Sequence, residues 1–132
     1  MISDKIKNRI EIAGARFHSN DNISEYINPG ELELLQDEVE SKLQSVLDSL
    51  VIDTNNDHNT NETAKRVAKM YVQEIFGGRY KPLPKITAFP NMGYKSLYTS
   101  GPISIRSTCA HHFQNIVGKC WIGIIPESEV IG

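Results

Sequence analysis

A cysteine and two histidines stand within the run Arg106 to Phe113, and this run restricts the fold more than any other part of the chain. Residues three apart, such as Cys109 and His112, share a face on a helical turn but point in opposite directions on a flat strand. If Cys109 and His112 bind one metal ion, the run must lie on a turn or bulge where a strand ends. His111 is then left free for other chemistry.

The residues alone leave three interpretations of this run open. A lone Cys in a reducing compartment is usually a small buried hydrophobic residue. Thiolate and imidazole are also zinc ligands, but structural zinc needs four ligands and catalytic zinc needs three plus a water position. A nucleophilic Cys-His pair is the third interpretation, although such partners usually meet across a fold rather than side by side in the sequence.

Alternating stretches flank the Cys-His run on both sides. In the stretch 98–107, apolar and polar residues alternate around Ile103 and Ile105. The stretch 115–125 carries apolar residues on both faces of the expected strand. Both patterns predict long strands. The run therefore falls at the junction between two strands, as its spacing requires.

The segment 31–50 has the spacing of an amphipathic helix of roughly five turns. Its apolar residues recur at intervals of three and four: Leu32, Leu35, Val39, Leu43, Val46, Leu47 and Leu50. The acidic start of this segment suits the positive end of the helix dipole. A polar loop over 53–61 follows, rich in the Asn and Asp residues that favour turns.

A second helix is predicted to begin with Thr63 as its N-cap and to end at Gly77 and Gly78. Its buried side is expected to consist of Val67, Met70, Tyr71, Glu74 and Ile75. An adjoining stripe consists of Arg66, Lys69 and Gln73. Arg and Lys suit phosphate oxygens, so the spacing fits either a solvated surface or an anion site.

Residues 1–30 predict an N-terminal arm. Ile6, Ile10 and Ala13 can form one face of a short helix, and Pro29 with Gly30 marks a break before the next helix. Scattered large apolar residues in such an arm are typical of a segment that docks on its own domain or on a neighbouring subunit.

Two motifs, in order along the chain, resemble a known family. The first runs from Thr63 to Gly78 and is followed by Pro84-Lys85-Ile86-Thr87; the second is Thr108-Cys109-Ala110-His111-His112-Phe113, followed by Val117-Gly118-Lys119, Ile124-Ile125-Pro126-Glu127 and Val130-Ile131-Gly132. Together they make the stretch from about Glu62 to Gly132 similar to GTP cyclohydrolase I.

The resemblance implies a zinc-dependent enzyme that converts GTP to 7,8-dihydroneopterin triphosphate and formate, the entry step to folate and related pterins. It implies that Cys109 and His112 are zinc ligands and that His111 is the acid/base group beside the purine. Zinc suits this hydrolysis because it lowers the pKa of a bound water to about 7. By the same resemblance, Arg66 and Lys69 contact the substrate triphosphate.

The chain departs from the family pattern in several places. Ala64 and Ala110 stand where relatives often have Pro and Glu, and the family's third zinc ligand, guanine-recognising Glu and remaining triphosphate residues follow Gly132. Cys120 is no substitute ligand, because strand alternation predicts a core position for it. We therefore expect the sequence to be a fragment of a full enzyme, and the 132 residues alone to be inactive.

The implied architecture is α+β, with N-terminal helices followed by an antiparallel hairpin of the tunnelling fold that oligomerisation completes. We divide the chain into an arm and amphipathic helix over 1–61 and the first part of the catalytic domain over 62–132. The resemblance implies a homo-oligomer, as a pentamer-based ring or a decamer.

Composition limits the classes of binding partner and the cellular compartment that we expect for this chain. A formal net charge of −2 excludes a broadly basic nucleic-acid footprint, and the longest apolar runs are too short to span a bilayer. The N-terminus lacks the apolar core of a signal peptide, so we expect a cytoplasmic protein.

Two alternative functions stay open. One is a non-catalytic GTP- or pterin-binding module on the same scaffold. The other is a related tunnelling-fold enzyme with Cys109 as its nucleophile.

Overall fold

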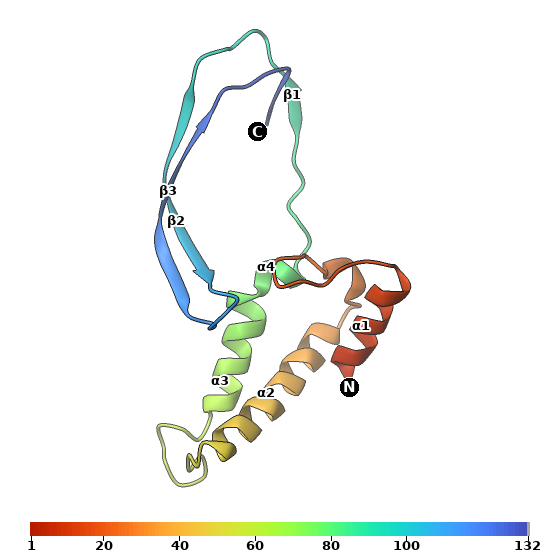
Figure 1. Ribbon diagram of the computed structural model, residues 1–132, viewed down its shortest axis with the longest axis vertical. Helices are drawn as coiled ribbons and strands as arrows, with labels where there is room; N and C mark the ends of the chain where they lie inside the picture. Colours follow the sequence, from red (N-terminus) through yellow and green to blue (C-terminus); the bar gives the residue numbers. More distant parts are fainter. Residues whose placement is uncertain (132) are drawn as a thin grey trace. The chain divides into compact units, whose positions relative to one another are not determined.

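The structure is a computed structural model, and it describes residues 1–131; Gly132, with which the predicted catalytic part ends, lies outside the described residues. Helices come first and antiparallel strands follow, which confirms the predicted α+β class (Figure 1). The elements are α1 (Ile2–Ile12), η1 (Ser24–Tyr26), α2 (Glu31–Ser49), α3 (Thr63–Lys69), η2 (Met70–Ile75), α4 (Gly77–Tyr80), β1 (Ala88–Pro90), β2 (Tyr98–Thr108), β3 (Asn115–Ile124) and β4 (Glu129–Ile131). The chain divides into a helical unit, Met1–Leu83, and a β unit that begins at Pro84.

The arm packs on the helical unit of its own chain. Ile6 and Ile10 of α1 lie in a buried cluster with Ile23 and with Leu35 of α2. The predicted short helix and the inward positions of Ile6 and Ile10 are therefore confirmed. Ala13 is the C-cap of α1 and is exposed.

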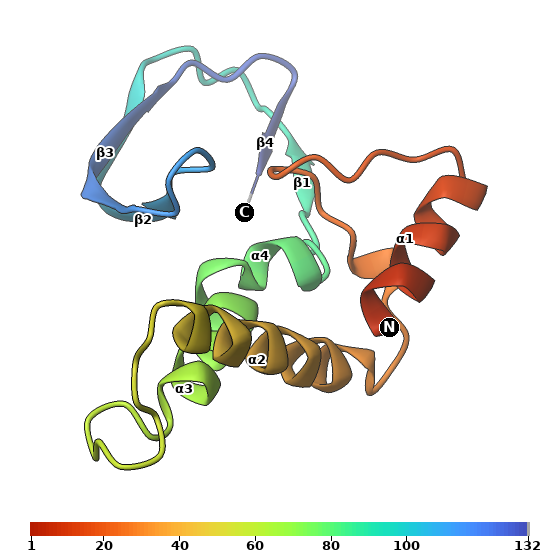
Figure 2. The same ribbon diagram turned by 60° about the horizontal axis from the view of Figure 1, so that its bottom comes forward.

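Helices α2 and α3 lie side by side (Figures 1 and 2). The predicted helix over 31–50 is confirmed. On the buried side predicted for the second helix, Val67, Met70, Tyr71 and Ile75 are half-buried, and the prediction is wrong at Glu74. The residues buried there are Ala64, Ala68 and Val72, whereas Glu74 is exposed. Small side chains let two helix backbones approach closely, so the packing follows the alanines rather than the larger apolar residues.

The predicted limits of the second helix are also wrong. Glu62 is the N-cap and makes no side-chain capping hydrogen bond, while Thr63 is the first helical residue. After Lys69 the helix widens into the π-helix η2, and the Phe76 N–H donates to the Tyr71 carbonyl, five residues back, at 2.8 Å. The glycine pair opens α4 instead of ending the helix.

Strands β2 and β3 form an antiparallel hairpin in the β unit, as the sequence predicts. Its register pairs Tyr98 with Ile124 and Thr108 with Asn115, and shifts at a bulge between Ser100 and Ile103. Strands β1 and β4 form a second antiparallel pair, which no sequence pattern predicts. None of the helices within residues 1–131 is long and apolar enough to cross a membrane.

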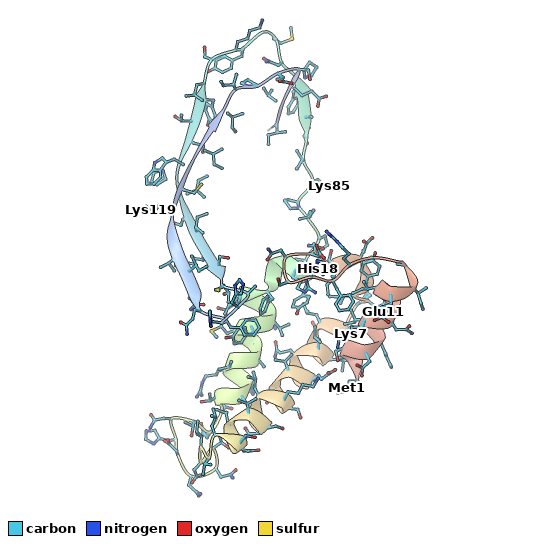
Figure 3. All side chains as sticks on the ribbon, viewed as in Figure 1. Met1, Lys7, Glu11, His18, Lys85 and Lys119 are labelled. Atoms are coloured by element: carbon cyan, nitrogen blue, oxygen red, sulfur yellow. The ribbon has the colours of Figure 1, made fainter. Side chains whose placement is uncertain are left out.

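The hairpin has one apolar face and one mostly polar face, and side chains stand out from both (Figure 3). Paired residues share a face, so the register gathers the aliphatic residues on one side. The apolar face consists of Tyr98, Ile103, Ile105, Ile116, Cys120, Ile122 and Ile124. The other face carries Arg106, Val117, Lys119 and Trp121. No described residue of the β unit is buried, and the predicted core residue Cys120 is half-buried.

Candidate functional site

The loop that joins β2 to β3 carries the Cys-His run at the strand end where its spacing predicts it. Two backbone hydrogen bonds shape this loop, and Cys109 makes both. Its N–H donates to the Gln114 carbonyl at 2.9 Å, and its carbonyl accepts the Phe113 N–H at 2.9 Å. Ala110, His111 and His112 form the turn between these bonds. Both backbone polar groups of Cys109 are therefore hydrogen-bonded within the loop, which fixes the position of its Cα and so the origin of its side chain.

The thiol of Cys109 lies beside an imidazole. Its Sγ is 3.7 Å from Nδ1 of His111, and the ring centroids of His111 and His112 are 6.3 Å apart. Zinc–sulfur and zinc–nitrogen bonds at a tetrahedral angle place the two donor atoms about 3.6 Å apart. The separation of this thiol and this imidazole thus fits ligands of a single zinc ion.

The observed pair includes His111, whereas the resemblance implies His112 as the second ligand. The three donors of this turn offer two thiol–imidazole pairs, and each pair leaves the other imidazole for proton transfer. The predicted division of roles between His111 and His112 therefore stays a prediction.

Within the part of the chain that the structure describes, no group of three or more His, Cys, Asp and Glu side chains could hold a metal ion. The donors of the loop fit zinc in chemical type, because thiolate and imidazole are its usual protein ligands. They do not complete its coordination in number. A zinc ion held here needs at least one further ligand.

The two predicted phosphate-binding residues lie on the exposed side of α3. The Nη2 of Arg66 donates to the Asn59 carbonyl at 2.9 Å and to the Thr63 Oγ1 at 3.2 Å, which anchors one side of the guanidinium. Lys69 is exposed, and neither cation has an ion pair within residues 1–131. Both charges are therefore available to an anion.

Gln73, the third member of the predicted stripe, has another partner. Its Nε2 donates to Oε1 of Gln36 on α2 at 2.7 Å. Gln73 therefore differs from Arg66 and Lys69, whose side chains make no hydrogen bond to α2 within residues 1–131. The π-helix accounts for this, because its wider turn displaces the residues after Lys69 from ordinary α-helical spacing.

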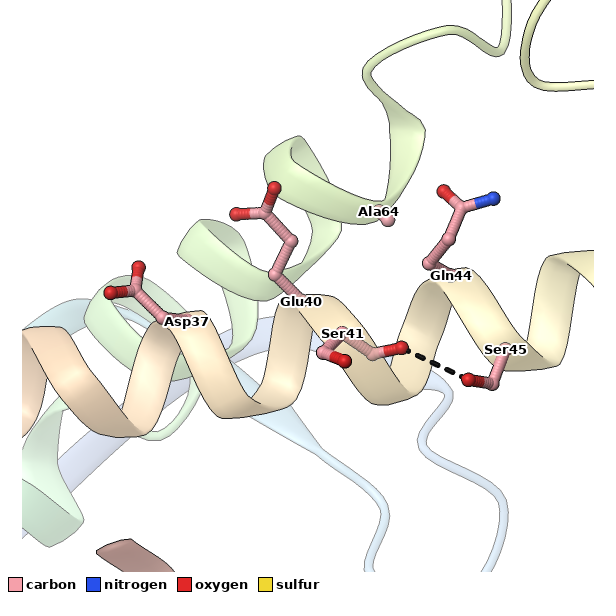
Figure 4. Close-up of a pocket in the computed structure, with 6 residues that line it drawn as sticks. All are labelled: Asp37, Glu40, Ser41, Gln44, Ser45 and Ala64. Atoms are coloured by element: carbon pink, nitrogen blue, oxygen red, sulfur yellow. Dashed lines mark hydrogen bonds between the residues drawn. The ribbon is translucent and has the colours of Figure 1, made fainter. Parts of the chain in front are cut away.

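Two grooves lie on the helical unit, and no predicted site residue lines either of them. One is lined by Asp37, Glu40, Ser41, Gln44, Ser45 and Ala64 (Figure 4). Its carboxylates would repel a triphosphate. The other lies over the buried cluster, beside Tyr80, where burial raises the pKa of the phenol.

One feature of the loop has no counterpart in the sequence pattern. Phe113 has a left-handed backbone, with φ of 53°. Gly and Asn are the residues that usually adopt it, so a sequence offers no signal for it at a Phe.

Comparison with known proteins agrees with these observations. A sequence profile of a family described as GTP cyclohydrolase I matches residues 39–132. A protein named GTP cyclohydrolase 1 from Shewanella sp. (strain ANA-3) is 38% identical over 99 residues, which is 74% of this chain and 45% of that protein. A protein of the same name from Shewanella loihica is 37% identical over 102 residues, covering 76% of this chain and 47% of its own length.

The chain spans less than half the length of these relatives. The matched region begins within α2 and includes α3, the Cys-His loop and both strands of the hairpin. The residues of the candidate site therefore all lie in the matched part.

Proposed function

The chain belongs to the GTP cyclohydrolase I family, and on that premise we propose that it is part of an enzyme that hydrolyses GTP to 7,8-dihydroneopterin triphosphate and formate. The observation that carries the proposal is the contact of the Cys109 thiol with the His111 imidazole, at 3.7 Å, on a loop that also holds His112. A soft metal donor and two proton-transferring groups are thus concentrated in the part of the chain that the family profile covers. The product would enter folate and pterin synthesis in the cytoplasm.

Cys109 and His112 would hold a zinc ion, with a third ligand from outside residues 1–132. When bound, zinc supplies a Lewis acid that makes water a competent nucleophile near neutral pH. His111 would donate a proton to the purine ring nitrogen as carbon 8 is attacked, because imidazole exchanges protons in this pH range.

Arg66 and Lys69 would bind the triphosphate. The guanidinium offers paired donors that match phosphate oxygens, and the ammonium adds a mobile positive charge. The bonds from Arg66 to Asn59 and Thr63 support this role, because they hold one nitrogen and leave the rest of the fork exposed.

Assembly into a homo-oligomer, as a pentamer-based ring or a decamer, would complete the sheet. The exposed aliphatic face of the hairpin supports this proposal, since Ile103 and Ile122 are 39% and 43% exposed. A two-stranded hairpin is marginal in water unless more strands or helices cover it.

An experiment with single-residue variants tests this proposal and distinguishes the role of His111 from that of His112. Zinc content and product formation are measured for Cys109→Ala, His111→Ala and His112→Ala in the chain extended through the segment that holds the third ligand. We expect the Cys109 and His112 variants to lose zinc. The His111 variant should keep zinc and lose about 10²–10⁴-fold in turnover, the usual contribution of a general acid or base.

His58→Ala is the matched control, because this imidazole lies in the polar loop with a side chain that is 91% exposed. Loss of zinc in the His111 variant, with retention in the His112 variant, would exchange the two roles. A zinc-loaded wild-type protein that forms no dihydropterin product from GTP would contradict the proposed activity.

A second candidate is a tunnelling-fold enzyme in which Cys109 is a nucleophile. The same thiol–imidazole contact favours it, because an adjacent base activates a thiol. Alkylation of Cys109 before and after zinc removal distinguishes the two: a zinc ligand reacts only after the metal is gone.

A further inference from the structure

A groove of the helical unit lies where the arm packs on α2 and α4. We call it the arm groove, and its volume is about 140 Å³. Its apolar lining consists of Ile6, Ile10, Phe17, Ile23 and Leu35. An apolar cavity of about 150 Å³ takes up benzene, so the arm groove has room for an apolar body of about six carbon atoms.

Every polar side chain that lines the arm groove is a cation or can donate a hydrogen bond. These residues are Ser3, Lys7, Arg79 and Tyr80, and no Asp or Glu of residues 1–131 is among them. The carboxylate of Glu38, which accepts hydrogen bonds from Ser3, is paired with Lys42. Within residues 1–131, neither Lys7 nor Arg79 has an ion pair. The arm groove therefore combines an apolar lining with uncompensated positive charge.

The positive charge of Arg79 is held at the arm groove by the arm itself. Its guanidinium is half-buried and donates to the backbone carbonyls of Phe17, His18 and Asp21. These acceptors are uncharged, and the Asp21 carboxylate accepts instead from Arg16 and from the His18 N–H. Because less water screens a half-buried cation than a solvated one, an anion in the arm groove would be attracted to Arg79 more strongly than to a surface lysine.

The arm groove joins a part of the chain that the family profile does not cover to a part that it does. The arm lies before the matched region 39–132, whereas Arg79 lies within it. The Ile23 N–H donates to the Arg79 carbonyl at 2.9 Å, and Nδ2 of Asn22 donates to the Gly78 carbonyl at 2.8 Å. A ligand in the arm groove would therefore contact both parts and stabilise the docked arm.

We propose that the arm groove binds a small carboxylate with an apolar body of about six carbon atoms, such as a short unbranched fatty acid. The body would contact the isoleucines and Phe17. The carboxylate would bind Lys7 and Arg79, since hydrogen bonds between ionised groups are stronger than those between neutral groups. The inference is independent of the proposed metal site and of GTP.

The test titrates hexanoate into the isotopically labelled chain and follows the backbone amides by two-dimensional NMR. We expect the amides of Ile23 and Tyr80 to shift and to saturate with a roughly millimolar Kd, as ligands of this size allow, while the amides of the hairpin stay unchanged. Hexanol keeps the apolar body and acetate keeps the carboxylate, so each should bind at least about fivefold more weakly than hexanoate. Hexanoate that shifts no amide of the arm groove, or that shifts those of the hairpin equally, would overturn the inference.

Lys7→Gln tests the positive charge. Lys7 is exposed, so its replacement should leave the fold intact, whereas Arg79 also anchors the arm. We expect Lys7→Gln to weaken hexanoate binding at least about fivefold and to leave hexanol binding unchanged. Lys5→Gln is the matched control, because Lys5 is exposed on the same helix and does not line the arm groove. Equal losses in the two variants would contradict the inference, because they would indicate a general attraction of the anion to α1.

Phe17→Ala tests the apolar lining. Phe17 is 40% exposed, so its replacement should also leave the fold intact. We expect this variant to weaken the binding of hexanoate and of hexanol at least about threefold each, because both lose contact with the ring. Leu34→Ala is the matched control, since Leu34 is 53% exposed and does not line the arm groove, and both ligands should bind it as they bind the wild type. Unchanged binding of both ligands to Phe17→Ala would contradict the placement of the apolar body.

Discussion

The helical unit and the β unit treat their apolar side chains in opposite ways. In the helical unit, Ile10 is 1% exposed and Ala68 is 0% exposed, whereas Ile103 and Ile122 on the apolar face of the hairpin are 39% and 43% exposed. Full burial of one such side chain stabilises a fold by roughly 1.5–3 kcal/mol. The helical unit is therefore stabilised by its own buried core. The apolar face of the hairpin, in contrast, is still exposed and is not packed against other side chains to the same extent. A sequence pattern identifies which face is apolar, but not what will cover it.

The strongest test of this difference removes equal numbers of atoms from each unit. Ile10→Ala should lower the free energy of unfolding of the helical unit by about 2–5 kcal/mol, because it leaves a cavity in a packed cluster. Ile122→Ala should cost less than about 1 kcal/mol, because that side chain is already in contact with water. Urea unfolding is followed by far-UV circular dichroism for the helices and by the fluorescence of Trp121, the only tryptophan, for the β unit. Equal losses would show that the hairpin has a core of its own.

A smaller effect is expected at Gly101, where the two strands of the hairpin pack closely. A Cβ built on Gly101 would lie 2.6 Å from Cδ1 of Trp121 and 3.0 Å from the Cys120 carbonyl oxygen, and its φ is 152°. Gly101→Ala should therefore destabilise the hairpin by about 1–3 kcal/mol, the usual cost of overpacking, and alter the Trp121 emission.

Gly118→Ala is the control for this substitution. Gly118 lies in β3 of the same hairpin, and a Cβ there would meet nothing within 4 Å. An Ala at Gly101 that proved as harmless as one at Gly118 would show that the bulge adapts, and that the hairpin is loosely packed throughout.

The parts of the fold that the sequence predicted are those with a strong local period. Helix α2 and strands β2 and β3 follow from alternating or three-and-four spacing, which depends on neighbouring residues alone. The buried side of α3 could not be predicted, because Ala64 and Ala68 are buried by the approach of another helix. Nor could β1 and β4, whose three residues each are too few to show a period.

The candidate site was predictable in its position but not in its geometry. The spacing of Cys109 and His112 required a turn at a strand end, and the loop between β2 and β3 supplies it. The contact of the thiol with His111 depends on side-chain rotamers, and the left-handed backbone of Phe113 depends on the whole turn. Neither property is contained in the spacing of residue types.

The smallest expected effect is a loss of stability at low pH, and it should be confined to the helical unit. Glu38 of α2 is largely buried, which opposes its ionised form, but hydrogen bonds from Lys42 and from the backbone and hydroxyl of Ser3 outweigh this and lower its pKa to about 2. Because the unfolded chain has the ordinary value of 4.5, the ionised Glu38 stabilises the fold above about pH 4.5, and this stability is lost as the pH falls toward 2. The Ser3 N–H is one of the unpaired donors at the start of α1, so Glu38 fastens the arm to α2.

Glu38→Gln should therefore lower the stability of the helical unit by about 1–2 kcal/mol at neutral pH, with a loss that shrinks as the solution becomes acidic. Circular dichroism in urea at several pH values measures this difference. Glu33→Gln, on the exposed side of the same helix, should leave the pH dependence unchanged, and Trp121 emission should not respond to Glu38→Gln. A change in Trp121 emission would mean that the stability of the hairpin depends on the helical core. The two units would then not differ in the way described above.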